Sequence, residues 1–309
     1  MEFPHQMTAV LLTGYGGFEK LVIRDDVPVP SLRAHEVLIR VGACGVNNTD
    51  INTRKGWYAP TVQGATEDNT VINNDDQGAW SGGLSFPRIQ GADVVGRIAA
   101  VGDQVSVERI GERIIVEPVV RNPQAPDDRE SIEYLGSERD GGFAEYVAIP
   151  AANAFPVHSG LSDAELATFP CSYSTAEHML TRIRITHQDT LLITGASGGV
   201  GSALVQLAKR RGATVAAVTS AAKKSALAAL GADMVIDRRD DLATALRQVL
   251  PEGRIDAVAD VVGGNGFPHL IEALRPGGRL SLIHISEPTR LKTRSRMPSS
   301  AGKGGGGGG

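Results

Sequence analysis

A glycine-rich turn between an apolar strand and a helix constrains the fold of this chain more than any other feature. The apolar residues TLLIT at 190–194 precede GASGGVG at 195–201, and helical periodicity then runs to Arg211. Glycines at 195 and 198 permit a tight turn in which backbone amides approach a phosphate, and Gly201 permits close packing of helix on strand. A plain tight turn explains one glycine but not their full placement, so the segment predicts a dinucleotide site. The expected contacts are Thr194, Gly195, Ser197, Gly198, Gly199, Val200 and Gly201.

Strands and helices alternate around this turn. Strands are expected at 190–194, 214–219, 234–236 and 257–262 and from Arg279 onward, and helices at 200–211, 223–230, 241–250 and 268–274. This alternation predicts an α/β fold with a doubly wound parallel sheet, the Rossmann architecture. A dinucleotide would lie along the carboxyl ends of the strands, which adds Val262 and Gly263 to the expected contacts.

The end of the second strand indicates which dinucleotide binds. A site for NAD usually has an Asp or Glu there, which holds the ribose 2′-hydroxyl. This strand instead ends in Thr219 and Ser220, followed by Lys223, with no carboxylate. Hydroxyls and a lysine suit the 2′-phosphate of NADPH, which a carboxylate would repel. The alternative is an ordinary helix N-cap followed by solvated lysines, and the two roles are compatible.

The N-terminal half follows a different pattern. Short apolar or β-branched runs bounded by Gly, Pro or Asp predict strands at 8–12, 36–43, 93–101, 113–120 and 143–150. Their spacing predicts a β-rich, barrel-like domain, interrupted by long polar loops at 59–88 and 122–140. We therefore expect one domain over residues 1–155 and the Rossmann domain over 156–279.

Composition excludes several classes of protein. The chain has 309 residues, 41% of them hydrophobic, and a formal net charge of −4, so it has no global basic surface for nucleic acid. No apolar run is long enough to span a membrane, and no signal-peptide pattern opens the chain. The two cysteines, Cys44 and Cys171, cannot form a disulfide framework and fit a reducing, cytoplasmic location.

Residues 280–309 differ in character from the rest of the chain. Leu280–Arg290 reads LSLIHISEPTR, which resembles, residue for residue, a translated sequencing adapter, and SRMPSSA at 295–301 resembles its continuation. Six glycines at 304–309 end the chain. We predict that this segment is a non-native tail, so its basic residues are not interpreted as a nucleic-acid arm. The alternative is a native strand at Leu280–Ile285 followed by a basic tail.

Several motifs together resemble a known superfamily. They are GACGVN at 42–47, GADVVG at 91–96, VGDQV with GER within 101–113, GGFAEY at 141–146, GASGGVG at 195–201, LGAD at 230–233 and RPGG at 275–278. The stretch from Met7 to Arg279 resembles the medium-chain dehydrogenase/reductase superfamily. The resemblance implies an N-terminal GroES-like catalytic domain, a Rossmann domain, and an active site between them.

Zinc-dependent members of this superfamily hold catalytic zinc with two cysteines and a histidine. The matching positions here are Asn47, Ala92 and Cys171, so two of the three protein ligands are absent. The four cysteines of the structural-zinc lobe are absent as well. We therefore predict no metal, with a rebuilt site that uses Asp93 and Cys171 as the alternative.

The pattern N-x-x-D-x-x-x-R-x-G-x-Y at 47–58 resembles the zinc-independent, quinone oxidoreductase-like members. The resemblance implies that Asn47 and Tyr58 line the nicotinamide and substrate cleft, and Thr49 retains a hydroxyl that could relay a proton. For Asp50 and Arg54 we expect an intradomain ion pair rather than catalysis, and Tyr58 could instead be a core aromatic residue.

These observations predict an NADPH-dependent oxidoreductase that transfers hydride to a quinone or an α,β-unsaturated carbonyl compound. Asn47, Thr49 and Tyr58 are the candidate catalytic residues, and the partner is a small molecule. One alternative is an alcohol dehydrogenase or aldehyde reductase with a modified zinc site. Another is a non-catalytic, NADPH-binding redox sensor.

The C-terminal end raises two further expectations. In this superfamily the chain returns after the Rossmann domain to complete the catalytic domain, and this return is missing here. We therefore expect a C-terminally truncated chain of low stability or activity. Members often form a homodimer through the edge of the Rossmann sheet, and a truncation would expose such an edge.

Overall fold

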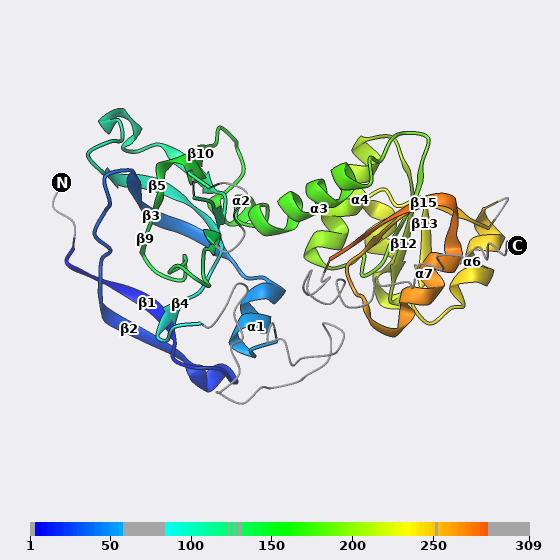
Figure 1. Cartoon of the computed structure of the whole chain (residues 1–309), viewed down its shortest axis with the longest axis horizontal. Helices are drawn as coiled ribbons and strands as arrows, with labels where there is room; N and C mark the ends of the chain where they lie inside the picture. Colours follow the sequence, from blue (N-terminus) through cyan, green and yellow to red (C-terminus); the bar gives the residue numbers. More distant parts are fainter. Residues whose placement is uncertain are drawn as a thin grey trace, which may run out of the picture.

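The structure, a computed structural model, describes residues 4–57, 84–122, 124, 125, 128, 131–250 and 253–283. Two domains lie side by side along the long axis of the molecule, and a helix, α3 (Pro170–Arg182), runs from one to the other (Figure 1). The N-terminal domain is built from β-sheets and the C-terminal domain from a parallel sheet covered by helices. This two-domain α/β fold confirms the predicted fold class.

The N-terminal domain contains two main antiparallel sheets. In the larger sheet the strand order is β10 (Ala154–Pro156), β6 (Arg113–Val116), β5 (Asp93–Val101), β3 (Glu36–Gly45) and β9 (Tyr146–Pro150). The smaller sheet has the order β2 (Leu21–Pro28), β1 (Gln6–Leu12) and β4 (Arg88–Ile89). A two-stranded ribbon pairs β7 (Val119–Val120) with β8 (Glu133–Tyr134). Alternate residues of β3, including Val37 and Ile39, point into a core shared with β5, β6 and β9.

The C-terminal domain is a five-stranded parallel sheet. Its strand order is β13 (Met234–Asp237), β12 (Thr214–Thr219), β11 (Thr190–Ile193), β14 (Ile255–Asp260) and β15 (Leu274–Leu282). Leu191 and Ile193 pack under α3 and α4 (Gly199–Arg210), whereas Leu192 packs under α6 (Leu242–Val249) and α7 (Phe267–Ala273). Because both faces are covered, the strands read as continuous apolar runs rather than alternating ones.

Several short elements complete the fold. They are α1 (Asn48–Arg54), α2 (Asp163–Leu166), α5 (Lys224–Ala229), and 3-10 turns at Phe18–Lys20, Val107–Arg109, Ala151–Asn153, Ala221–Lys223 and Gly264–Gly266. The predicted strand at 113–120 divides into β6 and β7, and β2 and α3 were not predicted from the sequence.

The prediction of an ion pair between Asp50 and Arg54 is wrong. Asp50 accepts backbone N–H groups of Asn47 and Gly91, whereas Arg54 donates to the Gly16 carbonyl and lies over the Phe18 ring.

The packing of side chains shows where the first domain ends and the second begins. The predicted boundary at residue 155 falls within β10, and Leu166 and Ala167 of the following segment still pack against Val95 in the larger sheet. From α3 onward the buried residues Ala176 and Leu180 belong to the core of the parallel sheet. We therefore propose that the second domain begins at α3.

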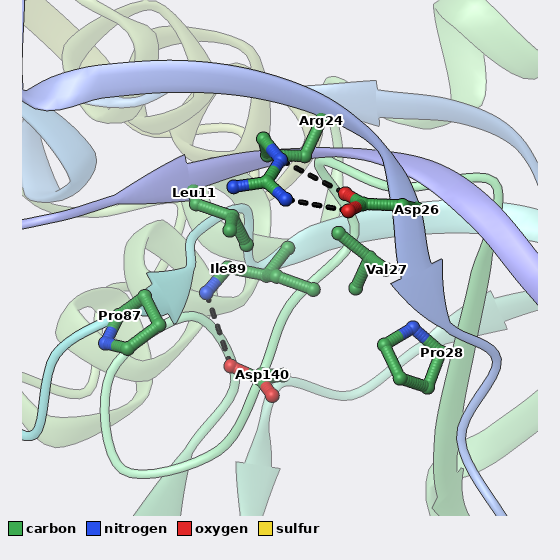
Figure 2. A pocket seen from close by; sticks show the side chains of 8 residues that line it. All are labelled: Leu11, Arg24, Asp26, Val27, Pro28, Pro87, Ile89 and Asp140. Carbon is green, nitrogen blue, oxygen red and sulfur yellow. Dashed lines mark hydrogen bonds and ion pairs between the residues drawn. The ribbon is translucent and has the colours of Figure 1, made fainter.

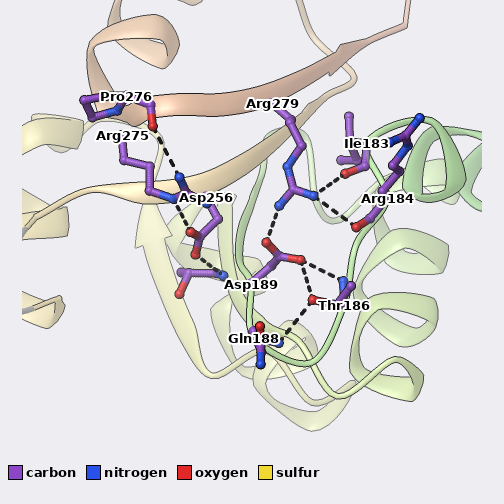
Figure 3. A network of polar contacts seen from close by, with 10 residues as sticks. Ile183, Arg184, Thr186, Gln188, Asp189, Asp256, Arg275, Pro276 and Arg279 are labelled. Carbon is purple, nitrogen blue, oxygen red and sulfur yellow. Dashed lines mark hydrogen bonds and ion pairs between the residues drawn. The ribbon is translucent and has the colours of Figure 1, made fainter.

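A polar network ties β15 to the loop before β11 (Figure 3). Arg279 donates to the carbonyl oxygens of Ile183 (2.8 Å) and Arg184 (3.0 Å) and pairs with the Asp189 carboxylate. Asp189 also accepts the N–H and the hydroxyl of Thr186, each at 2.8 Å. Burial opposes ionisation of Asp189, but these hydrogen bonds outweigh it, so the pKa of Asp189 is lower than usual.

Arg279→Ala is expected to lower the free energy of unfolding by about 2 kcal/mol, because it leaves two carbonyls and a buried carboxylate without their donor. The matched control is Arg275→Ala. It removes the more exposed pair with Asp256 and should cost less than about 1 kcal/mol. Urea unfolding measures both. Since the folded-state pKa of Asp189 is depressed, the Arg279 effect should shrink as the pH falls below about 4. Equal losses in the two variants would contradict this account.

Candidate functional site

Asn47 stands where β3 ends and α1 begins. Its backbone N–H donates to Asp50 Oδ2 (2.8 Å), and the Asp50 N–H donates back to the Asn47 carbonyl (3.1 Å), so the two residues fix the first turn of α1. The Asn47 side-chain nitrogen Nδ2 donates to Asp93 Oδ2 at 2.9 Å. A primary amide has two N–H donors, so one remains for a ligand.

Asp50 and Asp93 form a buried pair of carboxylates next to Asn47. Their exposed fractions are 8% and 1%. Burial raises the pKa of Asp50 to about 6, against the backbone N–H groups that donate to it. Burial also raises the pKa of Asp93 to about 6, against hydrogen bonds from Asn47 and Cys171, and the charge of Asp50 raises it further. Both carboxyl groups therefore change charge close to neutral pH.

The other side chains around this pair are neutral. Burial, followed by the charge of Asp93, raises the pKa of the Cys171 thiol to about 11, and burial raises the pKa of Cys44 still further. Neither thiol is a nucleophile at neutral pH. The Thr49 hydroxyl lies close enough to Cys171 to donate a hydrogen bond to the ionised thiol, and it has no other hydrogen-bond partner among the described residues. The structure thus brings Asn47 and Thr49 together, whereas Tyr58 lies outside the described residues.

This donor set does not fit catalytic zinc. Both oxygens of Asp93 already accept N–H groups, one from the Asn47 amide and the other from the Cys171 backbone (2.9 Å). Ala92 offers no ligand, and Cys171 supplies only one of the three protein ligands that catalytic zinc needs. No group of three or more His, Cys, Asp and Glu side chains in the described parts of the chain could hold a metal ion.

The predicted dinucleotide turn has the geometry that its glycines imply. Gly195 has a φ of +54°, in the left-handed region, and lies against the side chains of Val261 and Val262. A Cβ atom on Gly201 would lie 2.3 Å from the Gly195 carbonyl oxygen, so only glycine lets α4 approach the strand this closely. Gly198 and Gly199 are exposed at the N-terminus of α4, whose first N–H groups have no partner within the helix.

Asp260 fixes the facing loop after β14. It accepts the Thr194 hydroxyl and the backbone N–H groups of Val262 (3.0 Å) and Gly263 (3.2 Å), and the Val261 N–H donates to Thr194. Thr194, Val262 and Gly263 therefore meet at the carboxyl edge of the sheet, as predicted. Asp260 was not predicted, because a single acidic residue at a strand end carries no distinctive signal.

The end of β12 has an unsatisfied hydroxyl and nearby cations. Thr219 is 4% exposed, and its hydroxyl has no partner among the described residues. The Ser220 side chain makes no cap hydrogen bond to the following 3-10 turn, so the N-cap alternative does not hold for it, and Lys223 is exposed. Thr219 pairs with Asp237 in the sheet. This pairing brings Asp237 and Arg239 to the same edge as an ion pair (3.0 Å), and the sequence analysis identified neither residue.

A separate cavity lies away from these residues (Figure 2). It has a volume of about 300 Å³ and lies on the smaller sheet, between the apolar side chains of Leu11, Val27 and Ile89. Its polar rim is already paired, because Arg24 holds Asp26 and Arg88 holds Asp140. None of the predicted site residues lines this cavity.

Comparisons with known proteins agree with this arrangement. The family described as "Alcohol dehydrogenase GroES-like domain" matches residues 33–159, and "Zinc-binding dehydrogenase" matches residues 199–298. A solved structure of a putative alcohol dehydrogenase from Sinorhizobium meliloti is 48% identical, with a TM-score of 0.80, and covers 93% of this chain and 78% of its own. The chain therefore belongs to the medium-chain dehydrogenase/reductase superfamily, whose members are nicotinamide-dependent oxidoreductases.

Curated relatives are more distant. A 2-methylene-furan-3-one reductase of Solanum lycopersicum is 28% identical over 92% of this chain and 63% of its own length. A quinone oxidoreductase of Lama guanicoe is 26% identical over 94% of this chain and 77% of its own length. The chain spans 48% to 63% of the first curated relatives that it matches. Within the described residues, no helix has the length and apolar character to cross a membrane.

Proposed function

We propose that this protein is an NADPH-dependent, zinc-independent oxidoreductase that reduces a quinone or an α,β-unsaturated carbonyl compound. The observation that carries the proposal is the Asn47–Asp93 hydrogen bond, at the position where zinc-dependent relatives place a metal ligand. A fixed amide donor replaces the metal as the group that faces a substrate oxygen. The names of the relatives, a quinone oxidoreductase and a reductase of an unsaturated ketone, support this substrate class.

The residues at the carboxyl edge of the parallel sheet fit the dinucleotide. The first N–H groups of α4, at Gly199–Gly201, would bind the pyrophosphate. Thr219, Ser220 and Lys223 would bind the adenosine ribose and its 2′-phosphate, as the unpartnered Thr219 hydroxyl suggests. Val262 and Gly263 would lie along the cofactor beside Gly195.

The chemistry of the chain's own residues follows from their donors. When bound, the reduced nicotinamide supplies the hydride. As the substrate carbonyl oxygen gains negative charge, the free N–H of Asn47 and the Thr49 hydroxyl would donate hydrogen bonds to it. Because Asp93 holds the Asn47 amide in one orientation, this donor is in place before charge develops.

Lys223→Ala is expected to raise the Kd for NADPH about tenfold, since one charge-assisted hydrogen bond to a phosphate is lost. The Kd for NADH, which lacks the 2′-phosphate, should change less than about twofold and serves as the internal control. Equilibrium titration of cofactor fluorescence measures both constants. A similar weakening for both cofactors would refute the assignment of Lys223 to the 2′-phosphate.

Steady-state oxidation of NADPH by the purified chain tests the function. Quinones, enones and aldehydes are supplied with NADPH, and alcohols are supplied with NADP+. Turnover should occur with the quinones and enones only, unchanged by a metal chelator. Turnover of alcohols that a chelator abolishes and that Cys171→Ala removes would instead identify a modified zinc enzyme. Tight NADPH binding without any turnover would contradict the proposed reaction for this chain, and it is the result expected of a non-catalytic redox sensor or of a chain inactivated by truncation.

A further inference from the structure

The Asp93 carboxylate joins elements from both domains. It lies at the start of β5 and is 1% exposed. Its Oδ2 accepts the side-chain amide of Asn47, which leads into α1 of the first domain. Its Oδ1 accepts the backbone N–H of Cys171, in the first turn of α3. One buried side chain therefore contacts Asn47, the residue before α1, and the first turn of the helix that leads into the parallel sheet.

The next residue of α3 continues this connection to the dinucleotide turn. Ser172 is buried, and a Cβ atom built on Gly199 would lie 2.6 Å from the Ser172 hydroxyl oxygen, so this side chain packs directly on the turn. Behind it, Ala176 and Leu180 of α3 pack with Leu204 of α4 in one core. If the first turn of α3 shifts, the N-terminus of α4 should therefore shift with it.

We propose that Asp93 is a positioning residue that couples α1, the helix after Asn47, to the dinucleotide turn, through Asn47 on one side and Cys171–Ser172 on the other. We call this connection the latch. Only the expected effect of the latch on catalysis rests on the proposed function. The latch itself is a coupling between two parts of the fold. Binding of a dinucleotide at α4 should restrain α1, and loss of Asp93 should uncouple them.

The latch depends on the ionisation of Asp93. The ionised carboxylate accepts both N–H groups, whereas protonation turns one oxygen into a donor and costs one of the two bonds. The titratable groups around it are Asp50 on α1, Cys44 on β3, and Cys171 on α3, which is near Tyr134 of β8. Both thiols stay neutral, and the charge of Asp50 raises the pKa of Asp93. The latch should therefore weaken as the pH falls through about 6.

Hydrogen exchange tests the latch without a substrate. In the wild type, saturating NADPH or NADH should slow exchange of the amides at 48–54 in α1 about tenfold, along with those at the start of α4. In Asp93→Asn the protection of α4 should remain and that of α1 should disappear. Asn48→Ala is the matched control, because it changes an exposed side chain at the first position of α1 and touches neither Asp93 nor α3, and it should retain the protection of α1.

The outcomes separate the latch from the proposed function. Full protection of α1 in Asp93→Asn would overturn the latch. If neither cofactor protects α4 in the wild type, the cofactor assignment fails, and the latch is then judged on the Cys171 amide alone. That amide should exchange at least about tenfold faster in Asp93→Ala, which has no side-chain acceptor, than in Asn48→Ala. If Asp93→Asn does not fold, the wild type at about pH 5 and pH 8 gives the same comparison, with loss of Cys171 protection expected at the lower pH.

Discussion

Gly201→Ala is expected to raise the Kd for NADPH at least about 100-fold, which corresponds to about 2.7 kcal/mol of binding free energy. The added methyl carbon would lie 2.3 Å from the Gly195 carbonyl oxygen and 2.6 Å from Ala196 Cα. These are backbone atoms that cannot rotate away, so α4 must move from β11 and its N–H groups leave the pyrophosphate position. The same displacement should lower the free energy of unfolding by about 2 kcal/mol.

Gly198→Ala is the matched control for this substitution. Gly198 has a φ of −80°, and the nearest atom to an added Cβ is the Gly195 carbonyl oxygen at 3.5 Å, an ordinary contact. As the N-cap of α4, it should lose no more than about 1 kcal/mol of stability. Urea unfolding and cofactor titration on both variants decide the question. Wild-type affinity in Gly201→Ala would show that the dinucleotide does not use this turn.

Asn47→Ala is expected to lower kcat about 100-fold or more, with little change in the Kd for NADPH. It removes the amide donor to the substrate oxygen, and loss of one such donor costs about 3 kcal/mol of transition-state stabilisation. The neighbouring Asn48→Ala is the control, because Asn48 is exposed at the first position of α1 and should retain wild-type turnover. Steady-state kinetics with a quinone measure both.

The outcomes for Asn47 also separate a catalytic from a structural role. A loss of kcat together with a collapse in thermal stability would indicate that Asn47 only supports the cap of α1. Equal activity in Asn47→Ala and the wild type would remove Asn47 from the proposed mechanism.

The parallel sheet was predictable because burial on both faces forces continuous apolar strands. β12 was located to the residue, and β11, β13 and β14 to within two residues at each end. The N-terminal domain was harder to predict. Most residues of β2 are exposed, so its polar sequence IRDD gave no strand signal. In α3 the buried positions have helical spacing, but two of them are Ser172 and Ala176, whose polar or small side chains gave only a weak apolar face.

The candidate site divides in the same way. The glycine turn was predictable because all its residues are neighbours in the sequence. Asn47 was predictable as a site residue because of its position in a motif. The Asn47–Asp93 hydrogen bond joins residues 46 positions apart, and Arg239 reaches the cofactor edge only through the pairing of β12 with β13. Such contacts follow from sheet register, which the pattern of a single strand does not contain.

The segment at 280–282 illustrates a further limit. Leu280 pairs with Val258, and Leu282 pairs with Asp260, so residues predicted to belong to a non-native tail complete β15. β15 lies at the edge of the sheet and is only half-buried, so a short run with apolar residues, such as LSL, can complete it whatever its origin. We still propose a non-native tail. Leu280 and Ile283 pack against the two apolar cores of the parallel sheet, but Arg279 is the last described residue whose side chain makes a hydrogen bond (Figure 3).

The most direct test of the central claim is the fate of the transferred hydrogen. The chain is incubated with NADPH that carries deuterium at the reactive position of the nicotinamide, together with a simple enone, and the product is examined by mass spectrometry and NMR. With a metal chelator present, the account predicts a saturated ketone that carries one deuterium on its β-carbon, the alkene carbon that accepts the hydride. Deuterium on the carbonyl carbon of an allylic alcohol, or none in any product, would contradict it.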